Sequence, residues 1–331
     1  MNPEKTLGKP FVIVSQELPK GWLDLIKDEC EILVGSKNGK GFSQSFLNNL
    51  DRADALFTLL TDKIDENIIK SAPKLRVVSN MAVGVDNINL KACTKRKIPV
   101  GNTPGVLTDG TADLTISLLL AISRRIFEAS QDAKNGQWET WAPTGWLESD
   151  LNESVLGIIG MGKIGEAVAK RAHAFGLKIV YTSRSSKPII ENKLNAKRLD
   201  LYNLLSCSDY ISLHVPLNKN TKGLINKEEF KRMKSNTYLI NAARGSVVNT
   251  DSLYFALTKG LIAGAALDVT DPEPLPHTHP LYKLKNCLIT PHIGSATWNT
   301  RKRMAELACL NILSGLKGEK LPHCANPEVY L

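Results

Sequence analysis

The 331-residue sequence has no apolar run near the roughly 20 residues that a membrane-spanning helix requires. Its start, MNPEKTLGKP, lacks the apolar core of a secretory signal peptide, so we expect a cytoplasmic protein with no membrane partner. The six cysteines form no Cys-x-x-Cys pair, and His277 and His279 have too few cysteines or carboxylates near them in the sequence to suggest a zinc site. We therefore predict no metal site.

Aromatic residues are also scarce, at 6%, and they do not follow the basic residues along the chain. The formal net charge is +9, but the two short basic runs, Lys95–Lys97 and Arg301–Arg303, are typical of solvated helix faces. A nucleic-acid surface normally has a longer basic stripe with aromatics interleaved, so we predict no nucleic-acid partner. The positive charge instead favours small anionic ligands.

Apolar segments rich in β-branched residues alternate with helix-compatible segments, as in parallel α/β layers. Three such segments begin at Phe11, Ala55 and Arg76. A second series contains VLGIIG, KIVYTS, DYISLHV, TYLINAA, AGAALDV and NCLITP, which predict a second, complete doubly wound sheet. Between the two series, residues 109–126 are so apolar that we expect a buried helix with no face in water, covered within the chain or between subunits.

The first chemical motif is Gly160-x-Gly162-x-x-Gly165, which directly follows a strand pattern and opens an amphipathic helix pattern. In this context the glycines form a dinucleotide-binding fingerprint. The first allows a tight turn, the second lets the backbone approach a pyrophosphate, and the third lets helix and strand pack closely. The helix N-terminus then attracts the anion.

An acidic residue is missing after the second strand of this unit. In NAD-binding proteins an Asp or Glu there, about 20 residues into the motif, accepts hydrogen bonds from the adenosine ribose. Here no acid follows KIVYTS until Glu191, and the turn carries Ser183, Arg184, Ser185 and Lys187 instead. Cations and hydroxyls suit a 2′-phosphate, so the sequence favours NADP(H) over NAD(H).

Ionisable residues follow three further strands: Arg244 after TYLINAA, Asp268 and Glu273 after AGAALDV, and His292 after NCLITP. Ligands of open parallel sheets collect beyond the carboxyl ends of the strands, so these residues could converge. Arg244 could bind the carboxylate of a 2-oxo acid and polarise its carbonyl. His292 could protonate the carbonyl oxygen while Glu273 orients the imidazole and favours its protonated form. Each residue alone also fits a purely structural role, so the prediction depends on the combination.

Four segments, GIIGMGKIG, LINAARGSVVN, AALDVTDPEPLP and TPHIGSATWNTR, occur in this order. With them the chain resembles the D-isomer-specific 2-hydroxyacid dehydrogenases over nearly its whole length. Within that family it is most similar to the animal reductases of glyoxylate and hydroxypyruvate, to which VGVDNI, NTPGVLTDGTADL, WETWAP and SRSSK also point. The resemblance implies NADPH-dependent reduction of hydroxypyruvate to D-glycerate and of glyoxylate to glycolate. A phosphoglycerate-type dehydrogenase and a dinucleotide-sensing corepressor-like protein remain alternatives.

The resemblance implies a role for each matching residue. Arg244 would bind the small anionic 2-oxo or 2-hydroxy acid, His292 would be the acid/base, and Glu273 its partner. Substrate would also contact the backbone of Val83 and Gly84, Ser295, and the Trp141 of the neighbouring subunit in a homodimer. Cofactor contacts would come from Gly160, Gly162, Lys163, Ile164, Gly165, Ser183, Arg184, Ser185, Lys187, Val215, Pro216, Ala242, Asp268 and Gly294.

The family likeness also implies an α/β fold of two Rossmann-like doubly wound parallel-sheet domains with an active-site cleft between them. The first domain would be discontinuous and bind substrate, with residues 1–106 and 299–331. Residues 107–298 would form the NADP-binding Rossmann domain, including a dimerisation helix and the tryptophan-rich loop. The cleft would close over the substrate and exclude water.

Overall fold

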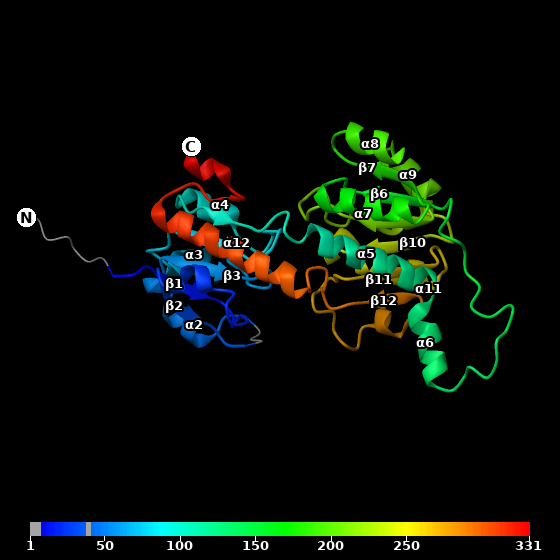
Figure 1. Cartoon of the computed structure of the whole chain (residues 1–331), viewed down its shortest axis with the longest axis horizontal. Helices are drawn as coiled ribbons and strands as arrows, with labels where there is room; N and C mark the ends of the chain where they lie inside the picture. The colour runs from blue at the N-terminus through cyan, green and yellow to red at the C-terminus, as the bar shows by residue number, and fades with distance from the viewer. Residues whose placement is uncertain (1–7, 38–40) are drawn as a thin grey trace, which may run out of the picture. The chain divides into compact units, whose positions relative to one another are not determined.

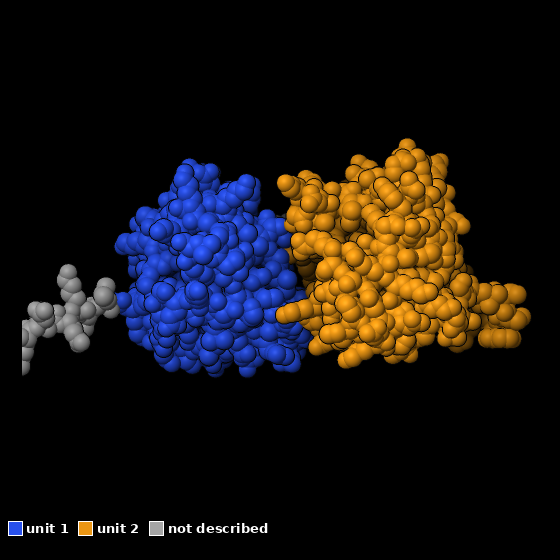
Figure 2. All heavy atoms as spheres, turned by 90° about the horizontal axis from the view of Figure 1, so that it is seen from above, with its two compact units in different colours: residues 1–107, 297–331 blue, residues 108–296 orange. Residues whose placement is uncertain are grey.

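The computed structural model describes residues 8–37 and 41–331 (Figure 1). The chain forms two compact units (Figure 2). Unit 1 comprises Met1–Leu107 together with Thr297–Leu331, and unit 2 comprises Thr108–Ala296. Among the described residues, segments from the N-terminal and the C-terminal parts of the chain therefore contribute to the same unit.

Unit 1 contains a five-stranded parallel sheet with the order β2-β1-β3-β4-β5. Its strands are β1 (Phe11–Val14), β2 (Glu31–Val34), β3 (Ala55–Thr58), β4 (Val77–Asn80) and β5 (Val100–Gly101). The short helices of the unit are α1 (Asp24–Lys27), α2 (Gln44–Asn48), α3 (Glu66–Ser71) and α4 (Leu90–Lys95). The long C-terminal helix α12 (Trp298–Lys317) returns to pack on β3, β4 and β5 (Figure 1).

The helix α12 can approach this sheet closely because it carries a glycine at the contact. A Cβ atom added to Gly315 would lie 2.5 Å from Val77 of β4. The three strands expected from the sequence are present in unit 1. The edge strands β2 and β5 were not expected, since β2 buries neither face fully and β5 has only two residues.

Unit 2 contains a seven-stranded parallel sheet with the order β12-β11-β10-β9-β6-β7-β8. Its strands are β6 (Val155–Ile159), β7 (Lys178–Thr182), β8 (Lys197–Arg198), β9 (Tyr210–Leu213), β10 (Tyr238–Asn241), β11 (Gly264–Leu267) and β12 (Cys287–Ile289). The six expected strands are all present, and β8 is an addition. The order changes direction between β6 and β9, which places a topological switch point beside the glycine turn.

The helices of unit 2 are α5 (Thr108–Ser123), α6 (Ile126–Lys134), α7 (Lys163–Ala174), α8 (Pro188–Leu194), α9 (Leu201–Cys207), α10 (Lys227–Arg232) and α11 (Thr250–Thr258). They flank its sheet, except for α6, which packs on α5 and has no buried residue. No helix in the described part of the chain is long and apolar enough to cross a membrane.

The apolar helix expected at 109–126 forms as α5, and within one chain it is not covered on every side. The helix packs on α7, β10 and β11, while Asp109, Asp113 and Ser117 form an exposed stripe at intervals of four residues. Arg171 of α7 binds Asp109 at 3.0 Å and Asp113 at 2.6 Å. Three polar residues at helical spacing thus give α5 one exposed stripe within the chain.

Candidate active site

The glycine turn between β6 and α7 shows why each glycine is needed. Gly160 has a φ of +104°, and a Cβ there would lie 2.6 Å from the backbone oxygen of His214. A Cβ on Gly165 would lie 2.3 Å from the oxygen of Gly160. Beside Gly162, by contrast, a Cβ would meet nothing within 4 Å. Two glycines allow the packing, and the third leaves open space at the N-terminus of a 12-residue helix, which fits a pyrophosphate.

Most of the other expected cofactor contacts lie at the carboxyl edge of the same sheet. Lys163 and Ile164 form the first turn of α7, and Val215 and Pro216 follow β9 shortly after its end. Ala242 directly follows β10. Because parallel strands end at one edge, these segments surround the space in front of the glycine turn.

The turn after β7 is held by a cation that the sequence reasoning missed. The Arg198 guanidinium of β8 donates to the carbonyl oxygens of Ser183 at 2.9 Å and Arg184 at 3.2 Å. The Ser183 hydroxyl donates to the carbonyl of Ser185 at 2.5 Å, while the side chains of Arg184 and Ser185 are exposed. Lys187 lies 3.4 Å from Glu166 of α7, so one of the expected 2′-phosphate ligands already has an acidic neighbour.

His292 and Glu273 form a direct pair. Nδ1 of His292 lies 2.6 Å from Oε1 of Glu273, and the two side chains are 25% and 33% exposed. The other carboxylate oxygen of Glu273 accepts a hydrogen bond from the Thr270 N–H at 3.3 Å. The imidazole is thus oriented through one nitrogen while the pair stays accessible to a reactant.

The turn that carries His292 is organised around Asp268, which is 2% exposed. One oxygen of this carboxylate accepts from the Thr290 hydroxyl at 2.7 Å and the Ile293 N–H at 2.8 Å. The other accepts from the Gly294 N–H at 2.8 Å. His292 has a left-handed φ of +52° within this turn. Asp268 therefore holds the conformation that presents the histidine.

Arg244 lies on the neighbouring turn, shortly after the end of β10. It is half-buried, and its Nη1 donates to the carbonyl of Ala243 at 2.8 Å. At Gly245 an added Cβ would lie 1.9 Å from the oxygen of Thr270, so this turn packs against the segment that leads to Glu273. The ends of β10, β11 and β12 thus bring these side chains to one edge of unit 2.

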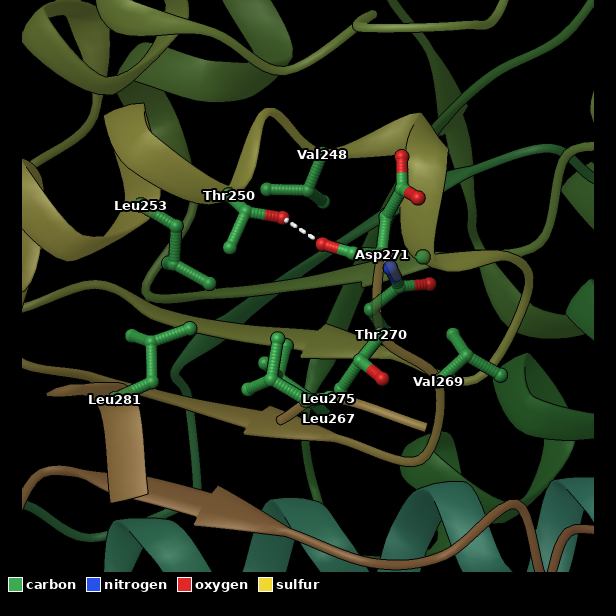
Figure 3. Close-up of a pocket in the computed structure, with 11 residues that line it drawn as sticks. Val248, Thr250, Leu253, Leu267, Val269, Thr270, Asp271, Leu275 and Leu281 are labelled. Carbon is green, nitrogen blue, oxygen red and sulfur yellow. Dashed lines mark hydrogen bonds between the residues drawn. The ribbon is translucent and has the colours of Figure 1, made fainter. Parts of the chain in front are cut away.

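A small pocket lies beneath the Glu273 segment (Figure 3). Its walls include Leu253, Leu267 and Leu275, and the Thr250 hydroxyl donates to the carbonyl of Asp271 at 2.8 Å across it. No residue of the glycine turn lines this pocket. We therefore interpret it as a packing space under the segment that carries Glu273, and not as a cofactor site.

The remaining expected site residues lie elsewhere. In unit 1, Val83 and Gly84 follow β4, and Val83 is exposed. In unit 2, Ser295 is half-buried beside Gly294, and Trp141 is 79% exposed. Among residues 8–37 and 41–331 there is no group of three or more His, Cys, Asp or Glu side chains that could hold a metal ion.

Comparisons with a family model, with known proteins and with solved structures agree with one another. Residues 116–294 match the family described as D-isomer specific 2-hydroxyacid dehydrogenase, NAD binding domain. A glyoxylate reductase from Thermococcus litoralis is 45% identical over 325 residues, which are 97% of this chain and 98% of that protein. Among solved structures, the TT0316 protein of Thermus thermophilus is 44% identical with a TM-score of 0.88, covering 95% of this chain and 99% of that one. An NADPH-dependent glyoxylate/hydroxypyruvate reductase from Sinorhizobium meliloti, in complex with NADP and malonate, is 27% identical with a TM-score of 0.83, covering 97% and 98%.

Proposed function

The chain belongs to the D-isomer specific 2-hydroxyacid dehydrogenase family, and on that basis we propose that it is an NADPH-dependent reductase of small 2-oxo acids. Its substrates would be glyoxylate, reduced to glycolate, and hydroxypyruvate, reduced to D-glycerate. The observation that carries this proposal is the His292–Glu273 pair at 2.6 Å, on the same sheet edge as the dinucleotide turn. Unit 1 would bind substrate and unit 2 the cofactor.

When bound, NADPH supplies the hydride. Arg244 binds the carboxylate of the 2-oxo acid and polarises its carbonyl, because a guanidinium is permanently charged and offers a fork of donors. Glu273 holds Nδ1 of His292, which leaves Nε2 as the nitrogen that gives a proton to the carbonyl oxygen.

The preference for NADPH rests on charge at the end of β7. No carboxylate occupies the strand tip, and Arg184, Lys187 and Arg198 place three cations at this turn. A 2′-phosphate would gain charge-assisted hydrogen bonds from them, whereas a ribose hydroxyl would find no carboxylate acceptor. Arg184→Ala should therefore weaken NADPH binding much more than NADH binding, and an equal loss for both would contradict the assignment.

The proposed enzyme is a homodimer joined through α6 and the loop that follows it. The helix α6 has no buried residue, and Phe127 is 61% exposed. In the loop, Trp138 and Trp141 are 74% and 79% exposed. Large apolar side chains exposed on one helix and on the loop that follows it favour a protein interface. Sedimentation of the wild type as a dimer and of Phe127→Glu as a monomer is the expected result, and a monomeric wild type would refute it.

The deciding experiment measures initial rates with glyoxylate and hydroxypyruvate, each with NADPH and with NADH. We expect turnover with NADPH well above turnover with NADH. His292→Ala should lose about a hundredfold or more in kcat while retaining NADPH binding, because only the proton donor is removed. Activity with NADH alone would overturn the cofactor assignment. NADPH binding without turnover of either acid would reject the reductase and favour a dinucleotide-sensing role.

A further inference from the structure

In unit 1, the loop after β4 has an unusual arrangement of its backbone carbonyls. Three consecutive carbonyl oxygens each accept a hydrogen bond from outside the loop. The oxygen of Ala82 accepts from the Thr103 N–H at 2.9 Å, that of Val83 from Asn102 Nδ2 at 2.8 Å, and that of Gly84 from Asn80 Nδ2 at 2.9 Å.

These three bonds also determine where the N–H groups of the loop point. In a trans peptide the C=O of one residue and the N–H of the next are directed oppositely. Fixing the carbonyls of Ala82 and Val83 therefore directs the N–H groups of Val83 and Gly84 to the other side. Among the hydrogen bonds formed within residues 8–37 and 41–331, none uses either N–H as a donor. Successive N–H groups presented in this way form a concavity that binds anions.

Asn80 fixes the carbonyl of Gly84, and so the peptide that follows the two amides, and its own side chain is held in place by its surroundings. It is fully buried, and its Oδ1 accepts from the Thr58 hydroxyl at 3.0 Å. Its Nδ2 also reaches Oδ1 of Asn87 at 3.0 Å. Asn87 in turn donates to the carbonyl of Asp62 at 2.8 Å. The amide cannot rotate without breaking several bonds, because both its oxygen and its nitrogen are in use.

Asn102 is less buried than Asn80, but hydrogen bonds also fix its position. Its backbone carbonyl accepts from Asn311 Nδ2 of α12 at 3.0 Å, and its backbone N–H donates to the carbonyl of His323 at 3.3 Å. The residue is half-buried. The backbone on which the side chain depends is thus tied to the C-terminal part of unit 1.

We propose that Asn102 is a positioning residue that holds the amide of Gly84 ready for the substrate carboxylate, and that Asn80 supports it by fixing the next peptide through the Gly84 carbonyl. This inference rests on the proposed function and on the expectation from the family resemblance that the backbone of Val83 and Gly84 contacts the substrate together with Arg244. The two asparagines act through the backbone and supply no proton or hydride. Because the carboxylate does not change during reduction, its binding contributes equally to the ground state and the transition state. Loss of positioning should raise KM and leave kcat nearly unchanged.

The test compares an anionic substrate with its neutral ester. For Asn102→Ala, KM for glyoxylate should rise about five- to tenfold, the worth of one lost hydrogen bond. kcat should stay within about twofold, and KM for methyl glyoxylate should not change, because the ester carries no charge for the amides to bind. Asn80→Ser should likewise raise KM for glyoxylate and leave KM for methyl glyoxylate unchanged. If this variant does not fold, the result for Asn102→Ala decides the test.

Asn326→Ser is the matched control for Asn80→Ser. Asn326 is likewise fully buried in unit 1 and donates to the carbonyl of Ile98 at 3.0 Å, away from the loop. Asn326→Ser should lower the stability of the protein, but it should not change KM for glyoxylate relative to KM for methyl glyoxylate. Equal KM changes for both substrates, or none, in folded Asn102→Ala would overturn the positioning role.

A binding measurement separates this inference from the reaction itself. Oxamate carries the carboxylate but is not reduced, so its affinity can be measured by calorimetry on the wild type and on Asn102→Ala in the presence of NADPH. Weaker oxamate binding by the variant supports positioning even if the wild type reduces neither acid. Equal oxamate binding by the two proteins rejects positioning even if the reductase activity is established.

Discussion

The buried carboxylate of Asp268 should be intolerant of replacement by asparagine. Asp268 accepts three hydrogen bonds in the turn that presents His292, and it is 2% exposed. In Asp268→Asn, an NH₂ group must face at least one of these donors. A buried donor without a partner costs about 1–3 kcal/mol, and the remaining bonds lose their charge assistance. We therefore expect the free energy of unfolding to fall by about 3 kcal/mol.

Activity should fall as well, because the same turn sets the position of the imidazole. A misplacement of about 1 Å can lower a rate about a hundredfold, and we expect a loss of that order in kcat. Urea unfolding and initial rates measure the two effects on one preparation. Thr290→Val removes only one of the three bonds, so it should cost about 1 kcal/mol and leave most of the activity.

Asp251→Asn is the matched control. Asp251 is exposed in the first turn of α11, and its replacement should change the free energy of unfolding by less than about 0.5 kcal/mol. If Asp268→Asn were as stable and as active as this control, the carboxylate would not be holding the histidine turn and the reasoning above would be refuted.

Three further predictions concern unit 2. Gly165→Val should lose both stability and NADPH binding, because its Cβ would lie 2.3 Å from a backbone oxygen. Gly162→Ala should keep its stability, since its Cβ meets only open space, but it should bind NADPH more weakly. Equal thermal stability of the two variants would contradict this prediction. Burial lowers the pKa of His214 from 6.5 to about 4, so the unfolded chain takes up a proton that the folded chain does not bind as the pH falls through this window. Stability should fall there by up to about 3 kcal/mol, and denaturation of His214→Gln should show a flatter pH dependence. Glu166→Gln removes the carboxylate 3.4 Å from Lys187 and should tighten NADPH binding up to about fivefold in a fluorescence titration, with weaker binding as the adverse result.

Much of the fold could be predicted because its signals are local. A strand of four or five buried residues is recognisable by its composition, as β6 and β9 are. The two-residue strands β5 and β8 are too short to form such a pattern, and their pairing depends on neighbours far away in the chain. The stripe of α5 that is exposed within one chain was not predicted for a different reason: its three exposed residues are too few to change the apolar average of the segment.

The candidate site divides in a similar way. Arg244, Glu273 and His292 could be proposed from the sequence because each follows a recognisable strand, and parallel strands end at a common edge. Arg198 offered no such signal. It reaches the turn after β7 only because β7 and β8 are neighbours in the sheet.

The sequence by itself determined the class of fold, the glycine turn, and the residue types at the strand ends, since these follow from short-range composition and spacing. Only the tertiary structure decided which backbone groups those residues serve. The hydrogen bonds of Asp268 with the histidine turn join segments more than 20 residues apart. The hydrogen bond of Asn102 with the Val83 carbonyl joins segments 19 residues apart. Such bonds depend on strand order and on the direction of each peptide plane, and neither is written in any single stretch of the chain.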